Sequence, residues 1–312
     1  MAAVLSADEI DFAAYMRMTD CKAKVRPASQ FVDDLVEDFD MTRERKRAPS
    51  MFSSSLGRAL EFRPGEVTIW AGYNGHRKSM FTGQVMAELC VERQRVLACS
   101  YEMMPRHTLG RMARQVLGGN VLARSTIERF MRWTDDRLWI FDHMGRIKPD
   151  EQLAVLQYFA AECSGQHVFI DSMMMVCESE ESLDEQKQFM TDLVRLAQET
   201  GLHLHLVAHC KKPLDEQKPP TKYDIRGSAA ISDQAHNVVM VWSDRARAAA
   251  LRKYPSDETW LEKPATKVQI AKQRNSHGEG VFDYWLHEAS MRFTDTRTEP
   301  VEPFVLNLEP NR

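Results

Sequence analysis

The stretch VTIWAGYNGHRKS, residues 67–79, decides the fold. Residues 67–71 form a short apolar, β-rich run of the kind that makes a buried strand, and residues 81–89 present apolar side chains at helical spacing. Between them, residues 72–79 match the pattern G-x-x-x-x-G-K-[ST] at all but one of its fixed positions. A strand, a glycine-bearing loop and a helix in this order predict a phosphate-binding loop, in which backbone N–H groups and the helix N-terminus face the phosphates.

Within this loop, the ammonium of Lys78 is expected to reach the β- and γ-phosphate oxygens, and the hydroxyl of Ser79 to bind Mg²⁺. Arg77 stands where the pattern has its last glycine. An arginine cannot be buried there without a partner, so its side chain is expected to point to solvent or to lie against phosphate. The alternative is a loop that has lost its affinity for nucleotide. The residues predicted to surround the nucleotide are Gly72, Asn74, Gly75, His76, Arg77, Lys78, Ser79 and Met80.

Further strands and helices alternate along the chain. Apolar, β-rich runs predict strands at 96–100, 138–141, 168–170 and 202–208, and helical spacing predicts helices at 109–116, about 150–163 and 184–200. This order predicts an α/β fold with a mostly parallel central sheet, covered by helices on both faces. Residues 267–273 and 281–286 flank SHGEG and predict a hairpin near the end. Ligands of such sheets bind at the carboxyl ends of the strands.

Three polar residues at those strand ends complete a site for phosphoryl transfer. Asp171 ends the strand VFID and is expected to hold Mg²⁺. Glu102, in SYEM, is placed to orient and deprotonate the attacking water. His209, after LHLHLVAH, is placed to touch the γ-phosphate and to report its loss to the following loop. Taken singly, Asp171 can also be a helix cap, Glu102 an exposed loop acid and His209 a structural histidine. His203 and His205 are expected to be packing or surface residues.

Composition limits the class of protein. The chain has 312 residues, 43% hydrophobic and 28% charged, as expected of a globular domain preceded by a short N-terminal segment. It has no apolar run near the roughly 18 residues that cross a bilayer and no secretory leader pattern, which predicts a cytoplasmic protein. A formal charge of −4 excludes a protein that coats nucleic acid with its whole surface, but it allows local contact. The six cysteines lack metal-ligand spacing, and no metal role is expected for them.

Two later segments resemble the DnaB-like family of hexameric replicative helicases, which includes phage helicases and the mitochondrial Twinkle helicase. The segment DIRGSAAISDQAHNVVMVW, residues 224–242, matches the family's DNA-facing motif, and KQRNSHGEG, residues 272–280, matches its K-x-R-N hairpin. The resemblance covers about residues 54–293 and implies a RecA-like domain that binds ATP and Mg²⁺ in a ring of six. The expected organisation is an N-terminal helix and linker at 1–53, the ATPase domain at 54–295 and a tail at 296–312. The N-terminal segment is either a solvated linker or a helix that docks on a neighbouring subunit.

The resemblance also gives roles to cations outside the phosphate loop. Lys272 and Arg274 would reach the ATP of the neighbouring subunit, with Arg274 as an arginine finger. Without the resemblance they are edge-strand cations that guard against aggregation. The loop CKKPLDEQKPPTKY, residues 210–223, and the DIRGS motif are predicted to contact the backbone of single-stranded DNA, although such a loop can equally be only solvated. The predicted DNA-binding residues are Lys211, Lys212, Lys218, Lys222 and Arg226.

The expected function is therefore that of an ATP-dependent helicase motor, which moves along single-stranded DNA and unwinds forked duplex. The resemblance implies primase and other replisome proteins as partners and a phage origin. No zinc-ribbon spacing precedes residue 54, which predicts a helicase-only chain or a fragment of a longer one. The alternatives are a RecA-like recombinase or loader without unwinding activity, and a DNA-binding ring whose ATPase Arg77 has impaired.

Overall fold

The computed structural model describes residues 48–120, 123–177, 182–212, 215, 217–275 and 278–304, together with the backbone of Val4–Leu5. The predicted N-terminal helix lies outside these residues. Among the described helices, none combines the length and the apolar character that crossing a membrane requires.

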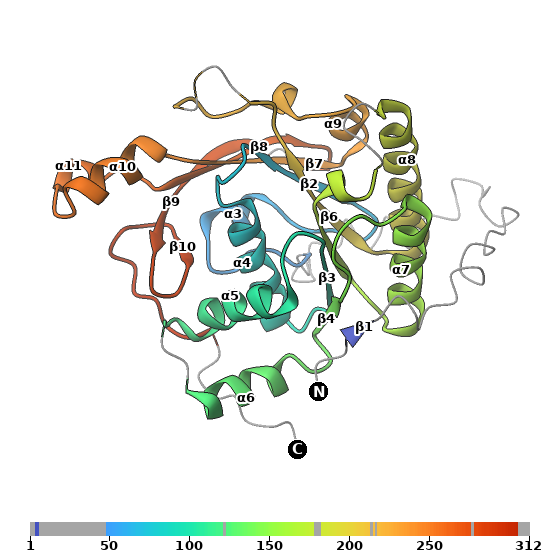
Figure 1. The fold of residues 1–312 in the computed structure, drawn as a ribbon, viewed down its shortest axis with the longest axis horizontal. Coiled ribbons are helices and arrows are strands. Elements are labelled where there is room, and N and C mark those ends of the chain that lie inside the picture. Colours follow the sequence, from blue (N-terminus) through green and yellow to red (C-terminus); the bar gives the residue numbers. More distant parts are fainter. Residues whose placement is uncertain are drawn as a thin grey trace, which may run out of the picture.

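A sheet of ten strands forms the centre of the molecule (Figure 1). Its order is β1 (Val4–Leu5), β4 (Leu138–Phe141), β3 (Val96–Ser100), β5 (His167–Asp171), β6 (His203–His209), β2 (Val67–Gly72), β7 (Asn237–Ser243), β8 (Thr266–Gln273), β9 (Gly280–His287) and β10 (Arg292–Thr294). Neighbouring strands from β1 to β7 are parallel, whereas β8, β9 and β10 join them as antiparallel strands. The predicted mostly parallel sheet and the predicted hairpin, β8–β9, are both confirmed.

Helices cover the two faces of the sheet (Figure 1). One face carries α3 (Ser55–Ala59), α4 (Lys78–Val91), α5 (Pro105–Leu117) and α6 (Arg124–Trp133), and the other carries α7 (Pro149–Glu162), α8 (Leu183–Thr200) and α9 (Ala230–Gln234). Alternate residues of the central strand β2 enter opposite cores, Ile69 one and Trp70 the other. All six residues of β2 are buried, as expected of a parallel strand covered on both sides. The phosphate loop therefore starts from a strand that is buried on both faces.

An arm between β7 and β8 was not predicted. It consists of α10 (Arg245–Lys253) and α11 (Glu258–Leu261), and it extends away from the sheet at the left of Figure 1. None of the described residues of these two helices is buried. The arm is tied to the domain by Trp285, whose indole N–H donates to Leu261 O at 3.2 Å, and by Arg297, which pairs with Glu258 and Glu262.

The folded domain continues beyond both predicted limits at 54 and 295. Met51 is buried, and Phe62 N donates to Pro49 O at 2.8 Å. At the other end, Phe304 N donates to Val116 O at 2.8 Å, and the Arg292 guanidinium lies 3.4 Å from the Phe304 ring centroid. Residues 48–53 and the first part of the predicted tail therefore pack against the domain.

Candidate active site

The phosphate loop joins the end of β2 to the start of α4. A Cβ atom on Gly72 would lie 2.2 Å from Val241 O of β7, so the strand can turn into the loop only where there is no side chain. Gly75 has φ 74° and Arg77 has φ 65°, and both lie in the left-handed region. That region suits glycine and costs other residues roughly 1–2 kcal/mol. Backbone conformation thus explains why a glycine is expected at position 77.

The Arg77 side chain lies at the rim of the loop. It is 25% exposed, and its guanidinium lies 3.9 Å from Glu288 Oε1. Burial lowers the pKa of Arg77, while the charge of Glu288 acts in the opposite direction. Arg77 also lines the cleft beside the loop. The guanidinium therefore adds positive charge at the mouth of the cleft and stays out of the protein core.

Lys78 and Ser79 face the ends of β2 and β5. The Lys78 ammonium donates to Gly72 O and to Tyr73 O, both at 2.9 Å, and is almost fully buried. Burial lowers the pKa of Lys78, and the nearby charge of Asp171 opposes that shift. Burial raises the pKa of Asp171, while a hydrogen bond from Ser79 opposes this. A hydroxyl and a carboxylate joined in this way are oxygen donors that suit Mg²⁺.

The sheet register brings the predicted residues of three other strand ends to the same edge. Ser100 of β3 is paired with Asp171 of β5, and Gly72 of β2 is paired with His209 of β6. Glu102 follows β3 by two residues. The carboxyl ends of these strands therefore meet at the phosphate loop.

Glu102 is held by two neighbours. The Ser172 hydroxyl donates to Glu102 Oε1 at 3.0 Å, and His209 Nε2 lies 3.9 Å from the same oxygen. Burial lowers the pKa of His209, and the charge of Lys78 lowers it further, although Glu102 opposes both. Among the described atoms, the buried His209 Nδ1 has no hydrogen-bond partner. His209 is thus a mostly neutral imidazole with one ring nitrogen left for a ligand or a water.

These groups line a cleft of about 610 Å³. Arg111 on α5 also lines it, and the sequence did not indicate that role, because a charged residue on an amphipathic helix is normally solvated. Burial lowers the pKa of Arg111, and the charge of Asp171 opposes the shift. Arg226, which was predicted to bind DNA, lines the same cleft. The full lining is Asn74, Gly75, Arg77, Lys78, Ser79, Met80, Glu102, Met103, Arg111, Asp171, Met174, His209 and Arg226.

His76, predicted to bind the cofactor, has a fully buried side chain. Its Nδ1 accepts a hydrogen bond from Ser243 N at 3.1 Å, so the imidazole fastens the loop to β7 and only the backbone of this residue can face a ligand. Arg245, at the start of the arm, donates to Asn74 O at 2.6 Å. The loop is thus fastened from inside by His76 and from outside by Arg245.

Lys272 and Arg274 lie elsewhere. The Lys272 ammonium donates to Ser232 O at 2.8 Å and to Asp233 O at 2.7 Å, and Arg274 donates to Asp233 O at 2.6 Å. Neither is among the described residues that line the cleft. Both are therefore held near α9 and away from the site of their own chain.

The predicted DNA-binding loop leaves the sheet at the end of β6 and returns through η4 (Lys222–Asp224). Lys211, Lys212 and Lys218 are exposed, and Lys222 is partly exposed. These ammonium groups are open to an anionic partner.

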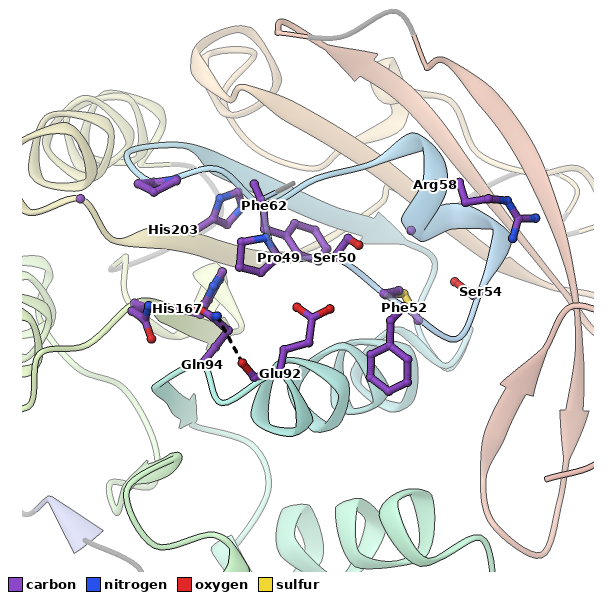
Figure 2. A pocket seen from close by; sticks show the side chains of 16 residues that line it. Pro49, Ser50, Phe52, Ser54, Arg58, Phe62, Glu92, Gln94, His167 and His203 are labelled. Carbon is purple, nitrogen blue, oxygen red and sulfur yellow. Dashed lines mark hydrogen bonds between the residues drawn. The ribbon is translucent and has the colours of Figure 1, made fainter. Parts of the chain in front are cut away.

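A second cavity, of about 640 Å³, lies at the opposite edge of the sheet, where β5 and β6 begin (Figure 2). Of the histidines gathered there, His203 is hydrogen-bonded through both nitrogens, Nδ1 to Arg63 O at 2.7 Å and Nε2 to Thr68 Oγ1 at 2.9 Å. His205 is buried and stacks on Phe169 with ring centroids 3.9 Å apart. The packing role predicted for both histidines is confirmed.

The histidines of this second cavity do not form a metal site. Within the described part of the chain, no group of three or more His, Cys, Asp or Glu side chains is arranged to hold a metal ion. The polar groups suited to phosphoryl transfer are gathered at the phosphate loop, on the other edge of the sheet.

Comparisons with known proteins agree with this arrangement. A family model described as an AAA domain matches residues 59–215, which is 157 of the 312 residues. A solved structure described as an ATPase domain superimposes with a TM-score of 0.69 at 14% identity, over 85% of this chain and 98% of that one. A DnaB-like replicative helicase, solved in a study of its interactions with primase, gives a TM-score of 0.68 at 16% identity, over 86% of this chain and 67% of that one. The predicted RecA-like fold is confirmed.

Proposed function

The chain belongs to the AAA domain family, and from this premise we propose that it is an ATP-hydrolysing helicase motor that works as a ring on single-stranded DNA. One observation carries the proposal: Lys78, Ser79, Asp171 and Glu102 converge on a single cleft of about 610 Å³. A lysine for the phosphates, two oxygen donors for a cation and a carboxylate for water are the parts that hydrolysis of a nucleoside triphosphate requires.

Binding of the nucleotide rests on the phosphate loop. The Lys78 ammonium exchanges its two loop carbonyls for β- and γ-phosphate oxygens, and the N-terminus of α4 adds N–H groups that attract anions. Ser79 and Asp171 would hold Mg²⁺, which would supply positive charge to offset that of the phosphates. Arg77 adds positive charge at the rim, so its presence in place of glycine is compatible with phosphate binding.

Glu102 performs the proton transfer. Its carboxylate orients a water and accepts its proton as the water oxygen bonds to the γ-phosphorus. The bond from that phosphorus to the bridging oxygen breaks, and the nucleoside diphosphate leaves with the electron pair. Ser172 keeps that carboxylate in position through the hydrogen bond of 3.0 Å. Arg111, which also lines the cleft, supplies positive charge where negative charge develops on the γ-phosphate.

His209 connects the chemistry to the DNA loop. It lies between Glu102 and Lys78, and its free Nδ1 is suited to a contact with the γ-phosphate or with a bridging water. Its carbonyl accepts a hydrogen bond from Arg226 N at 2.8 Å. Loss of the γ-phosphate therefore changes a residue that is bonded directly to the segment bearing the DNA contacts.

Assembly completes the site. Lys272 and Arg274 are bonded to backbone carbonyls of α9, which are neutral and can be exchanged for the phosphates of a neighbouring subunit. In this arrangement Arg274 acts as an arginine finger, so turnover depends on the ring. The DNA-binding lysines Lys211 and Lys212 face the single strand. Primase is a proposed partner because the similar DnaB-like helicase was studied with one.

Turnover of ATP and strand displacement on a forked duplex, measured with and without Lys78→Ala, test this function. We expect the wild-type chain to hydrolyse ATP and to displace the strand, and the variant to do neither. Turnover without displacement would contradict the helicase proposal and favour a recombinase or loader. A wild-type chain that neither binds nor hydrolyses ATP, while Arg77→Gly does both, would favour the impaired ring.

A further inference from the structure

Tyr223 is unusually exposed for a large side chain. Its exposed fraction is 81%, compared with 58% for Val281 and 54% for Tyr254, the next most exposed large hydrophobic residues in the described part of the chain. A ring with this exposure contributes little to the core. Its flat apolar face is instead open to a ligand, and exposed aromatic faces are suited to stacking contacts.

Hydrogen bonds hold the turn that carries this ring. Tyr223 is the middle residue of η4, and the Asp224 carboxylate accepts hydrogen bonds from Thr221 N at 2.7 Å and from Thr221 Oγ1 at 2.8 Å. This reciprocal cap fixes the turn on which the ring stands. A ligand that stacks on Tyr223 therefore does not have to order the backbone beneath it.

Short backbone hydrogen bonds connect the same turn to the active site. Lys211 N donates to Asp224 O at 2.8 Å, and Arg226 N donates to His209 O at 2.8 Å. Cys210 and Ile225 form a β-bridge between these two bonds. The turn that carries Tyr223 is thus joined to Lys211, and the segment that follows the turn is joined to His209, which lies beside Glu102.

The surroundings of Tyr223 are positively charged. The Lys222 ammonium lies 5.4 Å from the centroid of the Tyr223 ring, and Lys211, Lys212 and Lys218 are exposed on the loop that leads to it (drawn in ochre at the top of Figure 1). Lysines beside an exposed aromatic ring are the two parts of a site for single-stranded nucleic acid, one for the phosphates and one for the bases.

We propose that Tyr223 is a base-stacking residue for the single strand, which adds a sequence-independent base contact to the phosphate contacts of the neighbouring lysines. The inference rests on the proposed function, because it assumes that the loop meets single-stranded DNA. It adds a second kind of DNA contact, because the strand is held through the flat face of a base as well as through its phosphate charges.

The test is equilibrium binding of a fluorescent oligothymidylate and of an abasic strand of the same length, in the presence of a non-hydrolysable ATP analogue. Tyr223→Ala is expected to lower affinity for the oligothymidylate about 5- to 150-fold, the usual range for loss of one aromatic stack, and Tyr223→Phe to retain it. Affinity for the abasic strand is expected to be the same for all three proteins. The slope of affinity against salt stays unchanged in Tyr223→Ala, since no phosphate contact is lost.

Tyr254→Ala is a matched control. Tyr254 is also exposed, and its neighbour Lys253 lies 5.2 Å from its ring, but the pair sits at the end of α10 in the arm. Its substitution is expected to leave binding unchanged. If Tyr223→Ala binds the oligothymidylate as well as the wild type, or weakens both strands equally, stacking is ruled out while the helicase proposal stands. If the wild type binds neither strand, the proposed function itself fails.

Discussion

Replacing Glu102 by Gln separates the chemistry of the cleft from nucleotide binding. The carboxylate is 48% exposed and accepts a hydrogen bond from Ser172 at 3.0 Å. The glutamine carbonyl can accept the same bond, so the fold should change by less than about 0.5 kcal/mol. What the variant loses is the group that accepts the proton of the attacking water.

The expected loss of rate follows from that role. A general base contributes about 10²- to 10⁴-fold, which corresponds to roughly 2.7–5.4 kcal/mol of barrier. Nucleotide affinity should stay the same or rise a few-fold, because one negative charge is removed from a cleft that receives an anion. Single-turnover release of phosphate from bound ATP and Mg²⁺ measures the first quantity, and titration with a fluorescent nucleotide measures the second.

Glu128→Gln is the control for Glu102→Gln. Glu128 is exposed on α6, where it pairs with Arg124, and it takes no part in the cleft. Its substitution should leave both quantities unchanged. If Glu102→Gln loses less than about tenfold in rate, the catalytic role assigned to Glu102 is wrong.

Three further predictions concern stability and assembly. Arg77→Gly should raise the free energy of unfolding by about 1 kcal/mol in urea titrations. Glycine fits the left-handed backbone at this position, and the ion pair with the exposed Glu288 that is lost contributes little stability. A loss of stability would contradict this. Burial lowers the pKa of His203 to about 3, so below pH 6.5 the unfolded chain binds a proton that the folded chain does not, and stability is lost as the pH falls from 6.5 toward 3. Between pH 6 and 4, the free energy of unfolding of His203→Gln, measured by urea titration, should fall less steeply with pH than that of the wild type, by about 1.4 kcal/mol per pH unit. Equal slopes for the two proteins would contradict this role of His203. Arg274→Ala should bind ATP but not turn it over, and mixing it with Lys78→Ala should restore activity in mixed rings; normal turnover by Arg274→Ala alone would exclude action across an interface.

Most of the sheet and its cleft could be predicted because local patterns specify them. The buried strands have apolar runs, and the loop from Gly72 to Ser79 has its own residue pattern. Asp171, Glu102 and His209 were found because parallel strands end at one edge, a rule that needs no knowledge of side-chain contacts. The structure brings these three residues together, as expected.

What the sequence could not give are contacts made between distant segments. Nothing local to His76 indicates that its ring faces Ser243 of β7, and nothing local to Ser172 indicates that it holds Glu102. Arg111 looks like a solvated helix residue until α5 is placed beside the cleft. Such contacts depend on tertiary packing, which one sequence read along its length does not contain.

The arm and the domain limits were missed for a different reason. The sequence of α10 is rich in arginine and alanine, and a helix without a buried face gives no apolar period to detect. At the other end, the contact of Phe304 with Arg292 joins a proline-bounded tail to a short strand. Neither segment carries a local signal that distinguishes packed chain from linker.

Steady-state ATP turnover, measured across size-exclusion fractions of the wild-type chain and of Lys78→Ala with Mg²⁺ and single-stranded DNA, tests the proposed motor. The wild type should hydrolyse ATP in the assembled fractions, with stimulation by the DNA, and Lys78→Ala should be inactive in every fraction. Equal turnover by the two proteins, or full turnover by wild-type monomers, would contradict hydrolysis at this loop across subunit interfaces.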